Sequence, residues 1–174
     1  PGKYNFGSPG AGSPTHLAGV SFSQLHGNTM MHIAYRGGPP MVMAMLAGDV
    51  QLAFPTVTTV ATQLKAGKLK ALAVTTPQRM TSLPQVPTVA EVAIPGFSYS
   101  LWGGLFAPAD TPAAVVQSLN KEVNAILASP DIRARFDADN LSVPRNTPAE
   151  FAEYVRNQAV KFEKLVKEAN LKAE

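Results

Sequence analysis

The sequence predicts an α/β fold in which parallel βα units are followed by a separate run of helices. Short apolar strands alternate with helical patterns through the first part of the chain, which is typical of parallel βα units. From Thr111 onward one helical pattern follows another, and the last has an amphipathic face. The shift in pattern near residues 98–112 predicts a boundary between two parts of the chain.

Apolar spacing places the individual elements. The expected strands cover residues 4–6, 30–35, 50–54, 69–74 and 98–108, and the expected helices of the first part cover residues 15–26, 39–47, 57–65 and 88–91. Residues 69–74, LKALAV, are apolar on both faces, so we expect a buried central strand there. Residues 98–108 form the longest strand-like run, and its Gly103-Gly104 pair indicates a bend or a close approach of the backbone.

Hydroxyl residues mark the expected helix starts. Four times such a residue precedes a proline that can take the first helical position: Ser13-Pro14, Thr111-Pro112, Ser129-Pro130 and Thr147-Pro148. Thr88 with Glu91, and Thr147 with Glu150, also have the spacing of a capping box.

The composition excludes several classes of protein. A chain of 174 residues with 45% hydrophobic and 16% charged residues is long and apolar enough to fold. The net charge is +3, but the basic residues are scattered, so we expect no nucleic-acid partner. The absence of cysteine excludes disulfides, thiolate metal sites and a cysteine nucleophile. No run approaches the about 18 apolar residues of a membrane helix, and the first residues show no signal-peptide hydrophobic stretch.

The segment GSPGAGSPTH, residues 7–16, is the main candidate for a binding site. Its glycines allow backbone angles that side chains forbid, and it leads into the N-terminus of a helix at Ser13-Pro14. Backbone N–H groups and the positive end of a helix dipole meet there, which attracts an anion. Because the loop holds no Lys or Arg and lacks the GxGxxG spacing, a carboxylate fits better than a polyphosphate. The same glycines are also compatible with an ordinary tight turn.

Other polar and aromatic residues are weaker candidates. His16, His26 and His32 lack metal-ligand spacing, so we expect neither a metal nor another cofactor. Arg36 follows a strand, where it either meets an anion or lies in a surface turn, and Trp102 either walls a pocket or fills a core. A serine nucleophile needs a positioned base and acid, which the sequence does not offer, so a small α/β hydrolase is a minor alternative.

Six motifs follow one another along the chain: YNFGSPGAGSPTHLAG, HIAYRGG, LAGDVQLAF, LKAGKLKALAVTT, LPQVPTVAEVAIPGF and WGGLFAPADTPAAVV. Each is weak alone, but together and in this order they resemble the tripartite tricarboxylate transporter solute-binding family, also called Bug receptors. The resemblance runs from about residue 2 to the C-terminus.

The resemblance implies a periplasmic-binding-protein-like fold of type II, whose two lobes close over a small carboxylate. Residues 1–100 would form the second, ligand-binding lobe. Residues 101–174 would form a crossover strand and C-terminal helices of the first lobe, whose N-terminal half we expect to be absent. The surface left by that half-lobe would be apolar, and we expect the chain to self-associate through it.

The resemblance also implies a non-enzymatic, periplasmic receptor. Its partners would be a di- or tricarboxylate or a related organic acid, and the membrane subunits of a secondary transporter. An interaction or structural fragment without a ligand, docking through its long terminal helix, is the main alternative.

Carried over residue by residue, the resemblance assigns a ligand site. The loop would grip a carboxylate with backbone amides and hydroxyls, and a recurrent histidine follows: Ser8, Gly10, Ala11, Gly12, Ser13, Thr15 and His16. An aromatic, basic, glycine turn lies beside the cleft of the family: Tyr35, Arg36 and Gly37. Thr56 and Trp102 complete the set. Pro55 precedes Thr56 where an acidic residue would hold an ammonium, which favours a ligand without an amino group.

Overall fold

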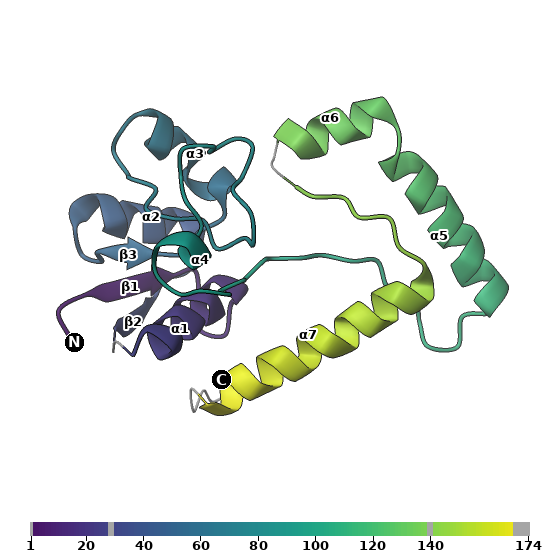
Figure 1. Ribbon diagram of the computed structural model, residues 1–174, viewed down its shortest axis with the longest axis horizontal. Helices are drawn as coiled ribbons and strands as arrows, with labels where there is room; N and C mark the ends of the chain where they lie inside the picture. Colours follow the sequence, from purple (N-terminus) through teal and green to yellow (C-terminus); the bar gives the residue numbers. More distant parts are fainter. Residues whose placement is uncertain (1, 28–29, 139–140, 169–174) are drawn as a thin grey trace. The chain divides into compact units, whose positions relative to one another are not determined.

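The computed structural model describes residues 2–27, 30–138 and 141–168 (Figure 1). Contacts divide the chain into two compact units. The first unit runs to Leu101 and includes the end of the last helix from Leu165, and the second comprises Trp102–Lys164. The assignment of these units to the lobes of a receptor stays a prediction.

A three-stranded parallel sheet forms the base of the first unit. β1 (Asn5–Ser8) lies between β2 (Met31–Ala34) and β3 (Leu52–Ala53) (Figure 1). Helix α1 (Pro14–His26) connects β1 to β2, α2 (Gly38–Ala47) connects β2 to β3, and α3 (Val57–Lys65) follows β3. The alternation of strand and helix is therefore confirmed, with the ends of the strands shifted by one or two residues.

Helices α1 and α2 cover opposite faces of this sheet, because neighbouring residues of a strand point to opposite sides. On β1, Phe6 faces α1: a Cβ atom added to Gly19 would lie 2.6 Å from Cδ2 of Phe6. The next residue, Gly7, faces α2, since an added Cβ would lie 3.2 Å from Cγ of Met41. Phe6 and Met41 are 2% and 1% exposed, so the core lies on both sides of β1.

The predicted central strand at residues 69–74 is wrong. Among the described residues, Val74 is the one member of this run that pairs with another segment, through an isolated parallel bridge to Thr88, and Leu72 is 59% exposed. A strand needs a neighbour that takes up its backbone hydrogen bonds, and apolar composition alone does not supply one. The segment therefore buries one face and leaves the other exposed.

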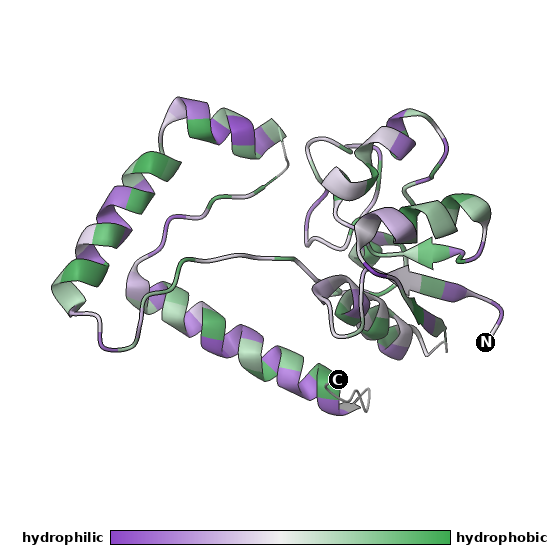
Figure 2. Ribbon diagram, turned by 180° about the vertical axis from the view of Figure 1, so that it is seen from behind, coloured by the Kyte–Doolittle hydropathy of each residue, from purple (hydrophilic) through white to green (hydrophobic). Residues whose placement is uncertain are grey.

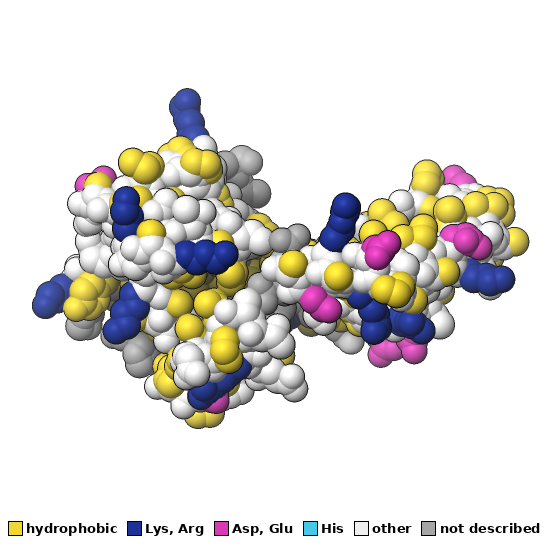
Figure 3. All heavy atoms as spheres, turned by 90° about the horizontal axis from the view of Figure 1, so that it is seen from above, with side chains coloured by type: hydrophobic (Ala, Val, Ile, Leu, Met, Phe, Trp, Pro, Cys, Tyr) yellow, Lys and Arg dark blue, Asp and Glu magenta, His cyan; other side chains and the backbone are white. Residues whose placement is uncertain are grey.

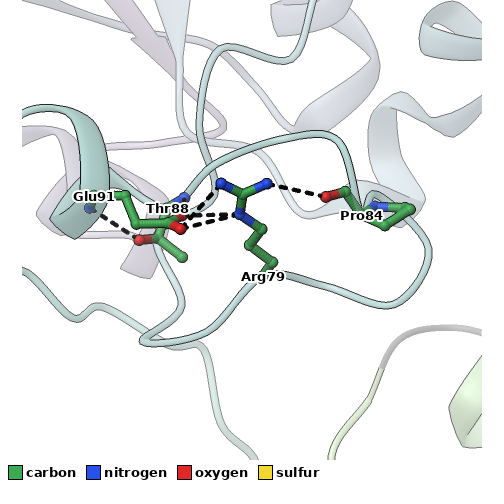
Figure 4. Close-up of polar contacts among 4 residues, drawn as sticks. All are labelled: Arg79, Pro84, Thr88 and Glu91. Atoms are coloured by element: carbon green, nitrogen blue, oxygen red, sulfur yellow. Dashed lines mark hydrogen bonds and ion pairs between the residues drawn. The ribbon is translucent and has the colours of Figure 1, made fainter.

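An irregular segment leads from Val74 to helix α4 (Val89–Val92), and polar contacts hold this segment to the helix. Thr88 caps this helix: its hydroxyl accepts from the Glu91 amide at 3.1 Å, and the Glu91 carboxylate accepts from the Thr88 amide at 2.6 Å. Arg79 binds the same carboxylate through its Nε atom and also donates to the carbonyl of Pro84 (Figure 4). The predicted capping box is confirmed, and these contacts hold the pKa of Glu91 below its usual value, first through the hydrogen bond from Arg79.

The predicted strand at residues 98–108 is also wrong. Tyr99 is buried, but Leu101, Leu105 and Phe106 are 57%, 77% and 70% exposed, and the run belongs to no sheet of the described residues. Its glycine pair was predicted to allow a close approach, which is confirmed at Gly104. An added Cβ there would overlap the ring of Phe151.

The second unit is helical, as predicted. It contains α5 (Ala113–Leu127), α6 (Pro130–Ala138) and most of α7 (Pro148–Glu168). Pro130 and Pro148 are the first residues of α6 and α7, as predicted. Pro112 is the N-cap of α5 and not its first residue, so this helix begins one residue later than predicted, at Ala113. The Thr147–Glu150 capping box is confirmed, with the Glu150 amide 3.2 Å from the Thr147 hydroxyl.

Apolar and polar positions alternate along α5 and α7 (Figure 2). Three apolar side chains of α5 are exposed: Val115, Leu119 and Ile126, at 46%, 54% and 57%. On the face seen in Figure 3, Lys and Arg side chains are dispersed and do not gather into one patch.

Candidate functional site

The candidate site lies at the edge of the sheet where the parallel strands end. The loop of residues 9–13 leaves β1 there, Tyr35–Gly37 leave β2, and Phe54–Thr56 leave β3. Because the strands are parallel, the N-termini of α1, α2 and α3 all begin at this edge. Ligands of open α/β sheets bind outside the carboxyl ends of the strands, and the positive ends of helix dipoles favour an anion.

Two backbone hydrogen bonds join the first two of these loops. The amide of Tyr35 donates to the carbonyl of Ser8 at 2.9 Å, and the amide of Gly37 donates to the carbonyl of Pro9 at 3.0 Å. The structure therefore brings together the predicted glycine-serine loop and the predicted Tyr35–Gly37 turn. The side chain of Arg36 is exposed.

Ser13 starts α1, as predicted. Its Oγ accepts from the amide of His16 at 3.2 Å and donates to the carbonyl of Gly10 at 2.7 Å. It also lies 3.2 Å from Oγ1 of Thr15. Gly12, just before it, has a φ of +71°, which a residue with a side chain adopts only with strain. The tight loop therefore depends on a glycine and a capping serine at adjacent positions.

Ser8 does not face the outside of the loop. It is 0% exposed, and its Oγ contacts the carbonyl of Gly10 at 2.8 Å, the amide of Gly10 at 3.2 Å and Nε2 of His32 at 2.7 Å. These contacts occupy the hydroxyl within the protein. Ser8 is thus placed to organise the loop, and its predicted direct contact with a ligand stays a prediction that this geometry does not favour.

The amides of the loop divide into two sets. Gly10 donates inward to Ser8, and Gly12 donates inward to Nδ1 of His16 at 3.0 Å. Among the described residues, no hydrogen-bond acceptor takes the amides of Ala11 or Thr15. Those two amides are the donors that the loop can offer to a carboxylate; the Thr15 hydroxyl donates to Ser13 Oγ at 3.2 Å and would have to turn to reach a ligand.

His16 and His32 form a stacked pair behind the loop. His16 comes from α1 and His32 from β2, and their ring centroids are 3.7 Å apart with 21° between the ring planes. Phe6 packs against both, with centroid distances of 6.0 and 5.0 Å. Burial lowers the pKa of His16 from its usual value, and burial together with the neighbouring His16 lowers the pKa of His32 to about 4.

The remaining predicted residues make their contacts with residues outside the loop. Thr56 is the N-cap residue of α3, and its hydroxyl contacts those of Thr58 and Thr59 at 3.0 and 2.8 Å. Trp102 belongs to the second unit, where its ring packs edge-on against Phe151 and Tyr154, at centroid distances of 6.0 and 5.4 Å. The side chain of His26 lies outside the described residues.

Sequence reasoning missed the role of His32. Read alone, the MHIAY run offers no partner for its histidine. The register of the sheet supplies the missing fact, since Phe6 pairs with His32 and both side chains therefore lie on the α1 face of the sheet. That register follows from tertiary pairing, which no local pattern contains.

Within the described ranges there is no cluster of three or more His, Asp or Glu side chains that would hold a metal ion. The same part of the chain contains no helix with the length and apolarity to cross a membrane.

The family described as the tripartite tricarboxylate transporter family receptor matches residues 1–171. The chain belongs to this family. The UPF0065 protein in the tcbD-tcbE intergenic region of Pseudomonas sp. is 35% identical over 99% of the chain and 52% of its own length. Protein BugT of Bordetella pertussis is 29% identical over 99% of the chain and 53% of its own length. The chain thus spans about half the length of the curated relatives it matches.

Solved structures of similar sequence share the fold. A structure of an R. palustris protein with adipate covers 98% of the chain at a TM-score of 0.85 and 29% identity. MatC from Rhodopseudomonas palustris with bound malate covers 95% at a TM-score of 0.77 and 28% identity, and the periplasmic binding protein BugD covers 99% at 0.80 and 30%. The chain matches 57%, 57% and 58% of those structures respectively. The α/β fold of periplasmic binding proteins is therefore confirmed over about half their length.

Membership of a receptor family places the chain outside the enzymes, as predicted. The close contact of Ser8 with His32 has the length of a nucleophile–base pair. However, the hydroxyl of a residue that is 0% exposed cannot reach a substrate, and in the part of the chain that the structure describes no carboxylate is hydrogen-bonded to either side chain. The pair is therefore a structural contact.

Proposed function

We propose that this chain carries the carboxylate grip of an extracytoplasmic receptor that captures a small carboxylate for a tripartite tricarboxylate-type secondary transporter. The main observation is the edge where three helix N-termini meet, with the amides of Ala11 and Thr15 left without acceptors in the described structure. Relatives solved with adipate and malate support a dicarboxylate as the ligand class.

In this proposal one carboxylate oxygen accepts from the amide of Ala11, and the other accepts from the amide of Thr15 and from its hydroxyl, which turns away from Ser13 Oγ to donate to the ligand. Neutral donors at the positive end of α1 stabilise the negative charge without a fixed salt bridge. Ser13 supports the grip as the cap that fixes the first turn, and Gly10 and Gly12 shape the loop. Tyr35, Arg36, Gly37 and Thr56 border the same edge. A ligand contact by Trp102 stays a prediction.

The proposed location is the periplasm, as relatives named a periplasmic binding protein and a periplasmic transporter suggest. The membrane subunits of the transporter would be its protein partners. Self-association through exposed apolar side chains of the second unit, such as Leu105 and Phe106, stays a prediction.

The test is a titration of the ¹⁵N-labelled chain with adipate and with malate, followed by amide chemical shifts. We expect saturable shifts centred on Ala11 and Thr15, and none with 1,6-hexanediol, which has the length of adipate without its charge. Thr15→Val keeps the shape of the side chain but removes the hydroxyl, and with it the proposed hydrogen bond to the ligand and the contact with Ser13 Oγ, so it should weaken adipate binding about tenfold. Thr62→Val, at an exposed position of α3, is the matched control and should change nothing.

A chain that shows no saturable shift with either acid, or shifts equally with hexanediol, would contradict the proposal. The interaction-fragment alternative would then gain support.

A further inference from the structure

We propose that His16 and His32 are positioning residues, which turn the amides of Gly10 and Gly12 into the protein and thereby leave those of Ala11 and Thr15 to the ligand. This inference deepens the proposed function and rests on it for the ligand. The arrangement of the loop itself can be tested without any ligand.

The first step is the direct anchor. The amide of Gly12 donates to Nδ1 of His16 at 3.0 Å. An atom that accepts this bond carries no proton, so His16 must be neutral with its proton on Nε2. An Nδ1-protonated or doubly protonated His16 would place two N–H groups against each other and release the middle of the loop.

The second anchor runs through Ser8. Nε2 of His32 lies 2.7 Å from Oγ of Ser8, which also accepts from the Gly10 amide at 3.2 Å. The Gly10 carbonyl already receives the hydroxyl of Ser13 at 2.7 Å. Either the Ser8 hydroxyl donates to His32, or His32 donates to Ser8 and the Ser8 hydroxyl donates to the Gly10 carbonyl at 2.8 Å; both arrangements keep the Gly10 amide directed inward.

The two anchors hold alternate residues of the loop, on either side of Ala11. Their side chains are shielded, since Ser8 is 0% and His16 5% exposed. Because the rings stack at 3.7 Å, the position of His32 on β2 also limits the position of His16 on α1. The stack thus links two strand-end loops that are already joined by the Tyr35–Ser8 and Gly37–Pro9 backbone bonds.

A space-filling role alone would not require histidine. A phenyl ring could also fill the space beside Phe6, but it would take away the acceptor of the Gly12 amide at position 16, or the contact of the Ser8 hydroxyl at position 32. A buried polar group that loses its partner is destabilised. The hydrogen-bonding atom of each ring is therefore the feature to test.

The chain offers matched variants for each ring. Asparagine presents an acceptor near the position of histidine Nδ1, so His16→Asn should preserve the Gly12 bond and His16→Phe should break it. Glutamine reaches the position of Nε2, so His32→Gln should preserve the Ser8 contact and His32→Phe should break it. Comparison within each pair separates the hydrogen bond from ring packing.

Amide hydrogen exchange in the 174-residue chain is the main readout. We expect His16→Phe to speed exchange at Gly12 by about tenfold or more relative to His16→Asn, and His32→Phe to do the same at Gly10 relative to His32→Gln. Exchange in the β1 amides should change little. Equal exchange in both members of a pair, or equal acceleration throughout the first unit, would overturn the inference.

The tautomer of His16 in the unaltered chain gives a measurement that does not depend on how variants fold. Long-range ¹⁵N–¹H spectra at pH 7.5 should show Nδ1 unprotonated and Nε2 protonated. Protonation at Nδ1 would overturn the inference.

Adipate titration of the same four variants then tests the link to binding. The Phe variants should bind about tenfold more weakly than their Asn and Gln counterparts, because the Ala11 and Thr15 donors are no longer held together. If exchange follows the expected pattern and the unaltered chain does not bind adipate or malate, the proposed function fails and the positioning of the loop stands. If the chain binds and all four variants bind alike, the positioning role for the ligand fails.

Discussion

Replacing Gly19 with alanine tests how α1, which starts at the candidate site, rests on the sheet. An added Cβ would lie 2.6 Å from Cδ2 and 2.9 Å from Cζ of Phe6, which is 2% exposed. Ordinary carbon contacts are about 3.5–4.0 Å, so the helix or the ring would have to move by about 1 Å. Phe6 has little room to turn, because the rings of His32, His16 and Phe54 lie 5.0, 6.0 and 6.2 Å from it.

The expected magnitude follows from two opposing terms. Overpacking of a core costs about 1–3 kcal/mol. Because the ring of Phe6 is surrounded by other rings, we expect a cost near the upper end of this range. Alanine is better than glycine within a helix by about 1 kcal/mol. The Gly19→Ala variant should therefore be less stable by about 2 kcal/mol.

Urea unfolding followed by far-UV circular dichroism measures this difference. Phe6→Leu removes much of the obstructing ring, so in that background Gly19→Ala should cost less than about 0.5 kcal/mol or should stabilise the chain. Gly103→Ala is a control, since an added Cβ there meets nothing within 4 Å. The reasoning would be refuted if Gly19→Ala raised stability by about 1 kcal/mol beside an intact Phe6, as at an exposed helical glycine.

Two further predictions concern pH and capping. The pKa of His32 falls from 6.5 to about 4 and that of His16 is also lowered, so the unfolded chain binds more protons in this window. The contribution of the two histidines to the free energy of unfolding should be fully present above pH 6.5 and should decline towards pH 4. A urea midpoint that is constant across this window, or a pH dependence that is unaffected by His32→Gln, would contradict this. Thr88→Ala removes the buried cap of α4 and should cost about 1–2 kcal/mol by urea unfolding, whereas Thr88→Ser should retain most of it; an equal loss in both would assign the effect to packing.

Local patterns predicted helices better than strands. The hydroxyl–proline pairs placed the starts of α1, α6 and α7, because a cap and the proline that follows it act within one turn of chain. The strands expected at residues 69–74 and 98–108 failed for the opposite reason. Their apolar residues fit a strand, but a strand exists only when a distant segment accepts its hydrogen bonds.

The candidate site shows the same division. The glycine-serine loop, its position before a helix and the capping role of Ser13 could be predicted from residues 7–16. The inward direction of Ser8 could not, because it depends on His32 in the neighbouring strand.

The sequence by itself determined the family, the alternation of strands and helices and the place of the glycine-serine loop, because these depend on order and on short-range spacing. Tertiary structure decided which amides remain available to a carboxylate. That choice depends on two histidines, 16 residues apart in sequence, whose rings meet only because α1 packs on the face of the sheet to which β2 contributes. Hydrogen bonds between distant segments require this packing, and no local pattern specifies it.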